Sequence, residues 1–226
     1  MVRVDVRPAR VHIFDVDHTL TRSSTGMIFA RAGLRSGMVT RRQLATLPFY
    51  YLRYRLGRLS LGAVTREIKP LRGYSRGELH ALARRAWEEE GRSNVYRSAM
   101  EYIGACRSAG AMIVLATSTF DVILEPMLEP LGVDHVLSSV LEFDAEDRST
   151  GWLVRGPCYA EAKAERIMEL LRRLEINPET CAFYSDSYHD LPGLNAVGMP
   201  VAVNPDTFLR RIAHRRGWPV FRWEKE

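Results

Sequence analysis

Cysteine, long apolar runs and low-complexity segments are scarce or absent in this sequence. The 226 residues contain only three cysteines, Cys106, Cys158 and Cys181, and no two of them form a CxxC pair. That spacing argues against a disulfide framework and against a structural zinc site. We expect three buried or half-buried thiols in a reducing compartment.

Two features of membrane and secreted proteins are also lacking. No stretch approaches the roughly 18 apolar residues that a membrane-spanning helix needs. The opening residues, MVRVDVRPARV, interrupt every short apolar run with a charge and build no secretory leader. With 46% apolar and 26% charged residues, the composition is that of an ordinary globular domain. We therefore expect a cytoplasmic protein, one core domain with an insert.

Positive charge is concentrated in one block. Between Arg22 and Arg92 there are 15 Lys and Arg against 5 Asp and Glu, whereas the whole chain carries only +5. The rest of the chain is therefore acidic. Such asymmetry favours an anionic partner, although a basic face that only keeps the protein soluble would give the same count.

The stretch LPFYYLRYRLGRLS, residues 47–60, interleaves aromatic and basic side chains. We interpret it as a helix with one aromatic core face and one basic face. Docking on an anionic membrane surface is an open alternative. No recognised nucleic-acid motif accompanies it, so nucleic acid is not an expected partner.

Apolar runs alternate with helical patterns along the chain. The expected strands are 10–16, 111–118, 133–143, 180–187 and 198–206. Helical patterns separate them, which predicts an α/β fold with a doubly wound parallel sheet. From Thr25 to Arg107 the pattern is mostly helical, with one helical piece at 93–110 and a capping-box spacing from Ser75 to Glu78. We expect a core domain, 1–22 and 94–226, and a helical cap inserted after the first strand, 23–93.

Polar side chains follow three of these strands. Asp15 and Asp17 end the first, the segment Thr117–Thr119 ends the second, and Asp186 ends a third. The carboxyl ends of parallel strands meet at one edge of a sheet, where ligands bind. Converging acids there would hold a hard cation such as Mg²⁺.

The chemistry that these groups support is phosphoryl transfer. Hydroxyls and backbone N–H groups at a strand-to-helix turn suit phosphate oxygens, and Lys163 opens an amphipathic helix that could reach the same edge. One carboxylate would attack phosphorus, and a second would move protons. An EF-hand also begins with Asp-x-Asp, but Thr19 and Gly26 occupy positions that it reserves for acids.

Four segments resemble the motifs of the haloacid dehalogenase superfamily. They are FDVDHTL at 14–20, VLATSTF at 114–120, Lys163, and YSDSYHDLPGL at 184–194. The cap after the first motif, TGWLVRGPCYAEAK and AVNPDTFLRRIAHRRGWPV resemble subfamily IB, which includes phosphoserine phosphatase. This resemblance spans residues 11–218. It implies a Rossmann-like core and Mg²⁺-dependent hydrolysis of a small-molecule phosphomonoester through an aspartyl phosphate.

The resemblance also implies a role for each matching residue. Carried over, the roles are as follows: Asp15 as nucleophile and metal ligand; Asp17 as general acid and base, its carbonyl on the metal; Thr117, with groups near Ser118 and Thr119, as phosphate ligands; Lys163 as the neutralising cation; Asp186 as a metal ligand; and Asp190 as a further ligand, through water, or as the partner of Lys163.

Two positions depart from the family pattern. His18 stands where small residues are commoner, and its imidazole could line the entrance and read the substrate. Ser24 stands where phosphoserine phosphatases carry a glutamate that receives the substrate's ammonium group, so phosphoserine is disfavoured. A phosphotransferase or phosphomutase, a lysophospholipid-phosphate phosphatase at a membrane surface, and a non-catalytic phospho-relay module remain the alternatives.

Overall fold

The computed structural model describes residues 9–41 and 69–223. The aromatic and basic stretch at 47–60, and with it the membrane-docking alternative, lies outside the described residues. Within them, none of the helices is both long enough and apolar enough to cross a membrane. The three cysteines are buried free thiols, as expected.

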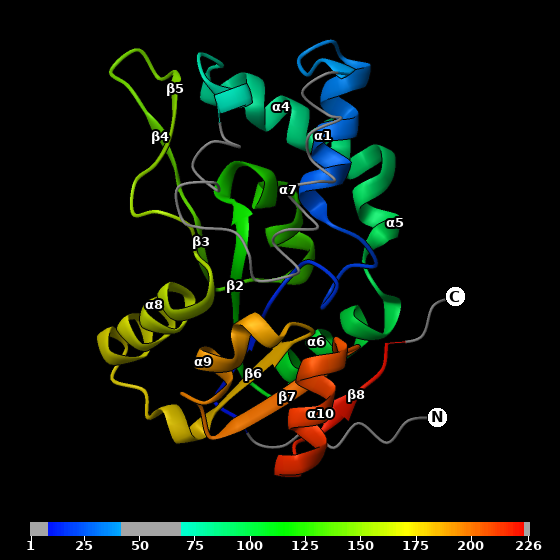
Figure 1. Ribbon diagram of the computed structural model, residues 1–226, viewed down its shortest axis with the longest axis vertical. Coiled ribbons are helices and arrows are strands. Elements are labelled where there is room, and N and C mark those ends of the chain that lie inside the picture. The colour runs from blue at the N-terminus through cyan, green and yellow to red at the C-terminus, as the bar shows by residue number, and fades with distance from the viewer. Residues whose placement is uncertain (1–8, 42–68, 224–226) are drawn as a thin grey trace.

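A six-stranded parallel sheet forms the centre of the described structure (Figure 1). The strands, in their spatial order, are β3 His135–Ser139, β2 Met112–Phe120, β1 Val11–Phe14, β6 Cys181–Ser185, β7 Met199–Val203 and β8 Val220–Phe221. All four residues of β1 are buried. Burial on both faces explains why the central strands are continuous apolar runs rather than alternating ones.

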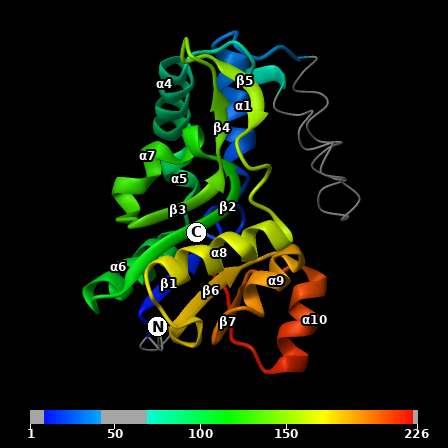
Figure 2. The same ribbon diagram turned by 90° about the vertical axis from the view of Figure 1, so that its left-hand side faces the viewer.

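Helices cover both faces of the sheet (Figure 2). On one face, Tyr102 and Met127 pack against the sheet; on the other, Ile167 and Leu209 do. The helices are α6 Arg97–Ser108 and α7 Asp121–Leu131 on the first face, and α8 Ala160–Arg173, α9 Leu191–Leu194 and α10 Thr207–Arg216 on the second. Two 3₁₀ turns, η3 Pro178–Thr180 and η4 Tyr188–Asp190, flank β6. The predicted doubly wound α/β fold is confirmed.

Strand order decides where a site can form. The chain moves from β1 outward through β2 to β3, and then returns to the other side of β1 with β6. Phe14 is in register with Leu115 of β2 and with Tyr184 of β6. The residues that follow these three strands therefore emerge together at the point where the strand order reverses, which is the ligand-binding crevice of such sheets.

The remaining elements lie above that edge (Figures 1 and 2). They are α1 Thr25–Arg35, the 3₁₀ turn η1 Lys69–Leu71, α4 Arg76–Ala86, the π-helical turn η2 Trp87–Gly91, α5 Arg92–Asn94, and a hairpin of β4 Leu141–Phe143 and β5 Ser149–Leu153. The capping box of Ser75 and Glu78 is present at the start of α4. Phe29, Leu79 and Leu141 share one buried cluster with Val122 of α7, so α1, α4 and the hairpin pack together and against α7.

The boundary of the cap stays a prediction, because the hairpin at 141–153 belongs by sequence to the expected core yet packs with α1 and α4. The expected helical piece at 93–110 is wrong at one point. Val95 is extended and bridges to Thr21, and Arg22 N donates to the Asn94 carbonyl, 2.8 Å away. This pairing of the two connections between the core and the cap elements interrupts the helix.

Candidate active site

Asp15 follows β1 directly and is buried, with a relative exposure of 6%. Its N–H continues the sheet ladder to the Tyr184 carbonyl at 2.9 Å, which fixes the backbone at the strand end. Lys163 Nζ donates to Asp15 Oδ1 at 2.9 Å, and the Thr19 hydroxyl donates to Oδ2 at 3.3 Å. The carboxyl group is therefore held from two sides.

Lys163 lies in the first turn of α8, and its relative exposure is 3%. Its ammonium group also lies 2.7 Å from Asp190 Oδ1 and 2.8 Å from Asp190 Oδ2. Ser185 Oγ donates to Asp190 Oδ2 at 2.6 Å. One buried cation thus links a carboxylate after β1 to a carboxylate after β6, and both oxygens of Asp190 are engaged by that cation.

Asp17 faces the first turn of α1. Its Oδ1 accepts hydrogen bonds from Thr25 N at 2.8 Å and Thr25 Oγ1 at 2.7 Å, and its Oδ2 accepts one from Ser24 Oγ at 2.8 Å. Three donors therefore fix the orientation of this carboxylate. Ser24, where a glutamate would have signalled phosphoserine, is occupied in holding Asp17.

Thr119 connects β2 to this arrangement, and β2 continues through the expected turn at Thr117–Thr119 as far as Phe120. The Thr119 hydroxyl lies 3.0 Å from that of Thr25, and the Thr119 N–H donates to Thr117 Oγ1 at 3.2 Å. The side chains of Thr117 and Thr119 are buried. Ser118 is half-buried, and its carbonyl oxygen accepts a hydrogen bond from Ser139 Oγ. The ladder between β2 and β3 shifts register here, the kind of bulge that re-aims side chains beside active sites.

Asp186 follows β6 and approaches Asp15 through Thr19. Thr19 Oγ1 lies 3.3 Å from Asp186 Oδ1, the same distance as from Asp15 Oδ2, and it accepts from Asp186 N at 3.0 Å. Thr19, Thr25 and Ser185 received no role from the sequence. Of these, only Thr19 could have been found from the sequence, because it is the threonine of the first motif, FDVDHTL, in which it follows the two aspartates.

His18 adopts a left-handed backbone conformation, with a φ of 64°. Together with Asp186 it lines a cavity of about 320 Å³ beside the strand ends. The sequence placed His18 at the entrance of the site, and the described geometry puts it at this cavity. A left-handed φ costs free energy for any residue other than glycine, so the turn after Asp17 is constrained by its surroundings.

Burial and crowding of acids dominate the electrostatics. Burial raises the pKa of Asp15 to about 7, against the opposing effect of the Lys163 ammonium. Burial, followed by the neighbouring carboxyl groups of Asp15 and Asp190, raises the pKa of Asp186 well above its usual range. One lysine therefore leaves negative charge uncompensated at this edge.

The carboxylates at this edge are too few to form a complete metal site by themselves. Within residues 9–41 and 69–223, no group of three or more His, Cys, Asp or Glu side chains could hold a metal ion. Mg²⁺ usually takes only one or two protein carboxylates and completes its shell with water and substrate oxygens. Asp15 and Asp186, which face each other across one hydroxyl and share excess negative charge, fit that requirement.

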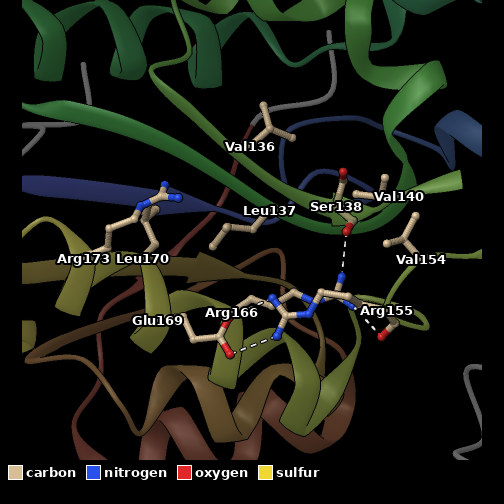
Figure 3. A pocket seen from close by; sticks show the side chains of 10 residues that line it. All are labelled: Val136, Leu137, Ser138, Val140, Val154, Arg155, Arg166, Glu169, Leu170 and Arg173. Carbon is tan, nitrogen blue, oxygen red and sulfur yellow. Dashed lines mark hydrogen bonds and ion pairs between the residues drawn. The ribbon is translucent and has the colours of Figure 1, made fainter. Parts of the chain in front are cut away.

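Arg166, a residue of α8, links the beginning of this helix to β3 (Figure 3). Its guanidinium is buried and donates to the carbonyl oxygens of Ser138 at 2.7 Å, Arg155 at 3.0 Å and Gly156 at 2.8 Å. These bonds tie β3 and the segment before α8 to the helix turn next to Lys163. A separate cavity of about 340 Å³ lies here, between β3 and α8.

The chain is similar in sequence to known hydrolases. The family model for haloacid dehalogenase-like hydrolases matches residues 13–195. A histidinol-phosphatase of Neisseria meningitidis is 29% identical over 218 residues, which cover 94% of this chain and 98% of the relative. Phosphoserine phosphatase SerB1 of Mycobacterium tuberculosis is 30% identical over 212 residues, 92% of this chain and 68% of that protein.

Solved structures share the fold of this chain. A protein of unknown function from Bordetella pertussis is 28% identical, with a TM-score of 0.83, over 95% of this chain and 99% of that one. A substrate-bound phosphoserine phosphatase shares the fold at 17% identity, with a TM-score of 0.69 over 95% and 93% of the two chains. Because the family model covers more than half of the residues, the chain belongs to the haloacid dehalogenase-like hydrolase family.

Proposed function

We propose that this protein hydrolyses phosphomonoesters of small metabolites through an aspartyl phosphate formed on Asp15. The observation that carries the proposal is the buried contact of Asp15 with Lys163, in a site where Asp17 is separately held by Ser24 and Thr25. Two carboxylates with different partners suit two different tasks. The names of the relatives, histidinol-phosphatase and phosphoserine phosphatase, support the reaction class.

In the first step a carboxylate oxygen of Asp15 attacks phosphorus, and the bond from phosphorus to the leaving oxygen breaks. Asp17 gives its proton to that oxygen, so the alcohol leaves neutral. In the second step Asp17 takes a proton from water as the water oxygen attacks phosphorus. The bond between Asp15 and phosphorus then breaks, phosphate is released, and both carboxyl groups return to their starting states.

The remaining residues balance charge. Lys163 neutralises part of the charge of Asp15 and of the incoming phosphate, and Asp190 and Ser185 hold the lysine in place. The hydroxyl of Thr117 and the groups of Ser118 and Thr119 near the end of β2 would contact the phosphate oxygens. Bound Mg²⁺, held by Asp15, Asp186 and the backbone carbonyl of Asp17, would supply positive charge that stabilises the transferring phosphoryl group.

The use of Ser24 to orient Asp17 supports a substrate other than phosphoserine, because this side chain carries no charge to receive an ammonium group. Histidinol phosphate, amino-alcohol phosphates and sugar phosphates are the candidate substrates. The described residues contain no observation that favours a membrane lipid or an acceptor other than water, and the test below has a separate outcome for transfer to another acceptor.

The test is phosphate release from a panel of phosphomonoesters in Mg²⁺ buffer, with Asp15→Asn as the blank. We expect Asp15→Asn to lower the rate by more than about 1000-fold, because it removes the attacking group, and we expect chelation of Mg²⁺ to abolish release. Asp147→Asn, the same change on an exposed turn, is the matched control and should behave as the wild type.

Release that survives Asp15→Asn would overturn the mechanism. Hydrolysis in ¹⁸O-labelled water must place one labelled oxygen in each phosphate released. If label is absent and product forms only when an alcohol acceptor is added, the protein is a phosphotransferase.

A further inference from the structure

The cavity of about 320 Å³ beside Asp186 is rich in groups that bind negative charge. Three arginines line it: Arg22 from the connection to the cap elements, Arg210 from α10 and Arg222 after β8. Arg22 contacts the Ser93 carbonyl at 3.4 Å and the face of Tyr96. Within residues 9–41 and 69–223, neither Arg210 nor Arg222 forms an ion pair.

Two acids also line the cavity, fewer than the three arginines, and neither forms an ion pair with them among the described residues. Asp206 caps α10: its Oδ1 accepts from Phe208 N and Leu209 N, and its Oδ2 accepts from Tyr188 N. Asp186 faces Thr19 and Asp15, where its charge belongs to the candidate cation site. The cavity wall therefore keeps an excess of positive charge.

Buried donors without an acceptor gather in the same place. Five buried side-chain polar atoms lack a hydrogen-bond partner among the described residues, and three of the five belong to residues lining this cavity. They are Arg22 Nε, Asn204 Nδ2 and Trp223 Nε1, and of these the Asn204 amide interacts with the Tyr96 hydroxyl. Trp223 is 8% exposed, and a buried donor left unpaired costs free energy. Arg22 Nε and Trp223 Nε1 can only donate, so an acceptor is the group that would complete them.

We propose that this cavity is a binding site for a small organic anion bearing a carboxylate or phosphate group. Planar guanidinium groups pair with both oxyanions in the same two-pronged geometry. A volume above about 300 Å³ is at the lower end of small-molecule pockets and exceeds what a bare ion needs. The anion is either a second acidic group of the substrate, since His18 and Asp186 line the cavity, or a separate molecule.

The binding test is calorimetric titration of the full chain with malonate, a dicarboxylate without phosphate, in Mg²⁺ buffer. The cavity variant combines Arg210→Gln with Arg222→Gln. The control combines Arg211→Gln with Arg215→Gln, exposed α10 residues that do not line the cavity. Both variants lose two positive charges. We expect the cavity variant to weaken binding by about tenfold or more and the control to leave it unchanged within about twofold.

A second variant addresses the unpaired indole. Trp223→Phe keeps an aromatic ring and removes the N–H donor, so we expect malonate affinity to fall by about three- to tenfold in a chain that still unfolds cooperatively. Absence of malonate binding to the wild type, or equal weakening in the two arginine variants, would overturn the proposal.

Matched esters identify the source of the anion. Propyl phosphate and 3-phosphonooxypropanoate have the same carbon chain, but only the second carries a carboxylate. If the anion is part of the substrate, the second ester is hydrolysed more efficiently, and the cavity variant loses that advantage. If it is a separate molecule, malonate still binds and the two esters react alike. Failure of the hydrolase proposal would leave both esters intact without affecting the calorimetric result.

Discussion

Thr25 is the residue on which the orientation of Asp17 most directly depends, since its backbone and hydroxyl both donate to the same carboxylate oxygen. Thr25→Val keeps the shape and removes the hydroxyl. Because hydrogen bonds to charged groups contribute about 1.5 to 3 kcal/mol, we expect kcat to fall about tenfold to a hundredfold with little change in KM. Steady-state kinetics on the best substrate of the panel measure this.

The control for Thr25→Val is Thr207→Val. Thr207 is likewise the first residue of a helix, but it is exposed on α10 and does not contact the candidate catalytic acids. Equal losses in the two variants would mean that the effect comes from helix initiation and not from Asp17.

At the scale of an element, the position of Lys163 depends on how α8 begins. No side chain caps this helix at Tyr159, and Arg166 instead ties the first turns to three carbonyl groups. Arg166→Met removes the donor from the buried Ser138 carbonyl and from two partly buried carbonyls, so we expect the free energy of unfolding to fall by about 3 kcal/mol. We also expect a lower kcat with a nearly unchanged KM, because Lys163 loses its fixed position.

Arg173→Met is the matched control for that element. Arg173 lies on the same helix and lines the same cavity between β3 and α8 (Figure 3), but its side chain is exposed. Denaturant titration and kinetics should leave this variant close to the wild type. An Arg166→Met protein with wild-type kcat would show that α8 is positioned by packing alone.

The stability of the whole molecule should depend on pH through His12, which is buried within β1 beside the rings of Phe14 and Tyr184. Burial lowers the pKa of His12 from 6.5 to about 4. Between these values the unfolded chain binds a proton that the folded chain does not. The free energy of unfolding therefore falls as pH drops from 6.5 to 4, by about 3 kcal/mol from this residue.

His12→Phe isolates this contribution. Tyr184 keeps a hydrogen bond to Tyr102 in the variant, since the two hydroxyls lie 2.7 Å apart. The raised pKa of Asp15 acts in the opposite direction, because the folded state then binds the extra proton, but it is common to both proteins. The difference in unfolding free energy between variant and wild type should grow as pH falls from 6.5 to 4. A constant difference would contradict the prediction.

Fold class, family and the order of the acids along the chain could all be predicted from the residues alone. These depend on local order: an apolar run predicts a buried strand, a strand end predicts the sheet edge, and Asp15 and Asp17 are two residues apart. Family and fold are confirmed. The roles of the acids, of Lys163 and of Thr117 stay predictions, supported by where their side chains lie.

Tertiary structure decided the contacts between distant segments. These contacts depend on packing across the sheet and between layers. Examples are the ion pair of Asp190 with Lys163, the Thr19 hydroxyl that lies between two carboxylates, and the cavity lined by Arg22 and Trp223. The break at Val95 has the same origin, because pairing with Thr21 outweighed local helix preference. Spacing along the chain determines on which face of a helix or strand a side chain lies. Only tertiary packing determines which groups it contacts there.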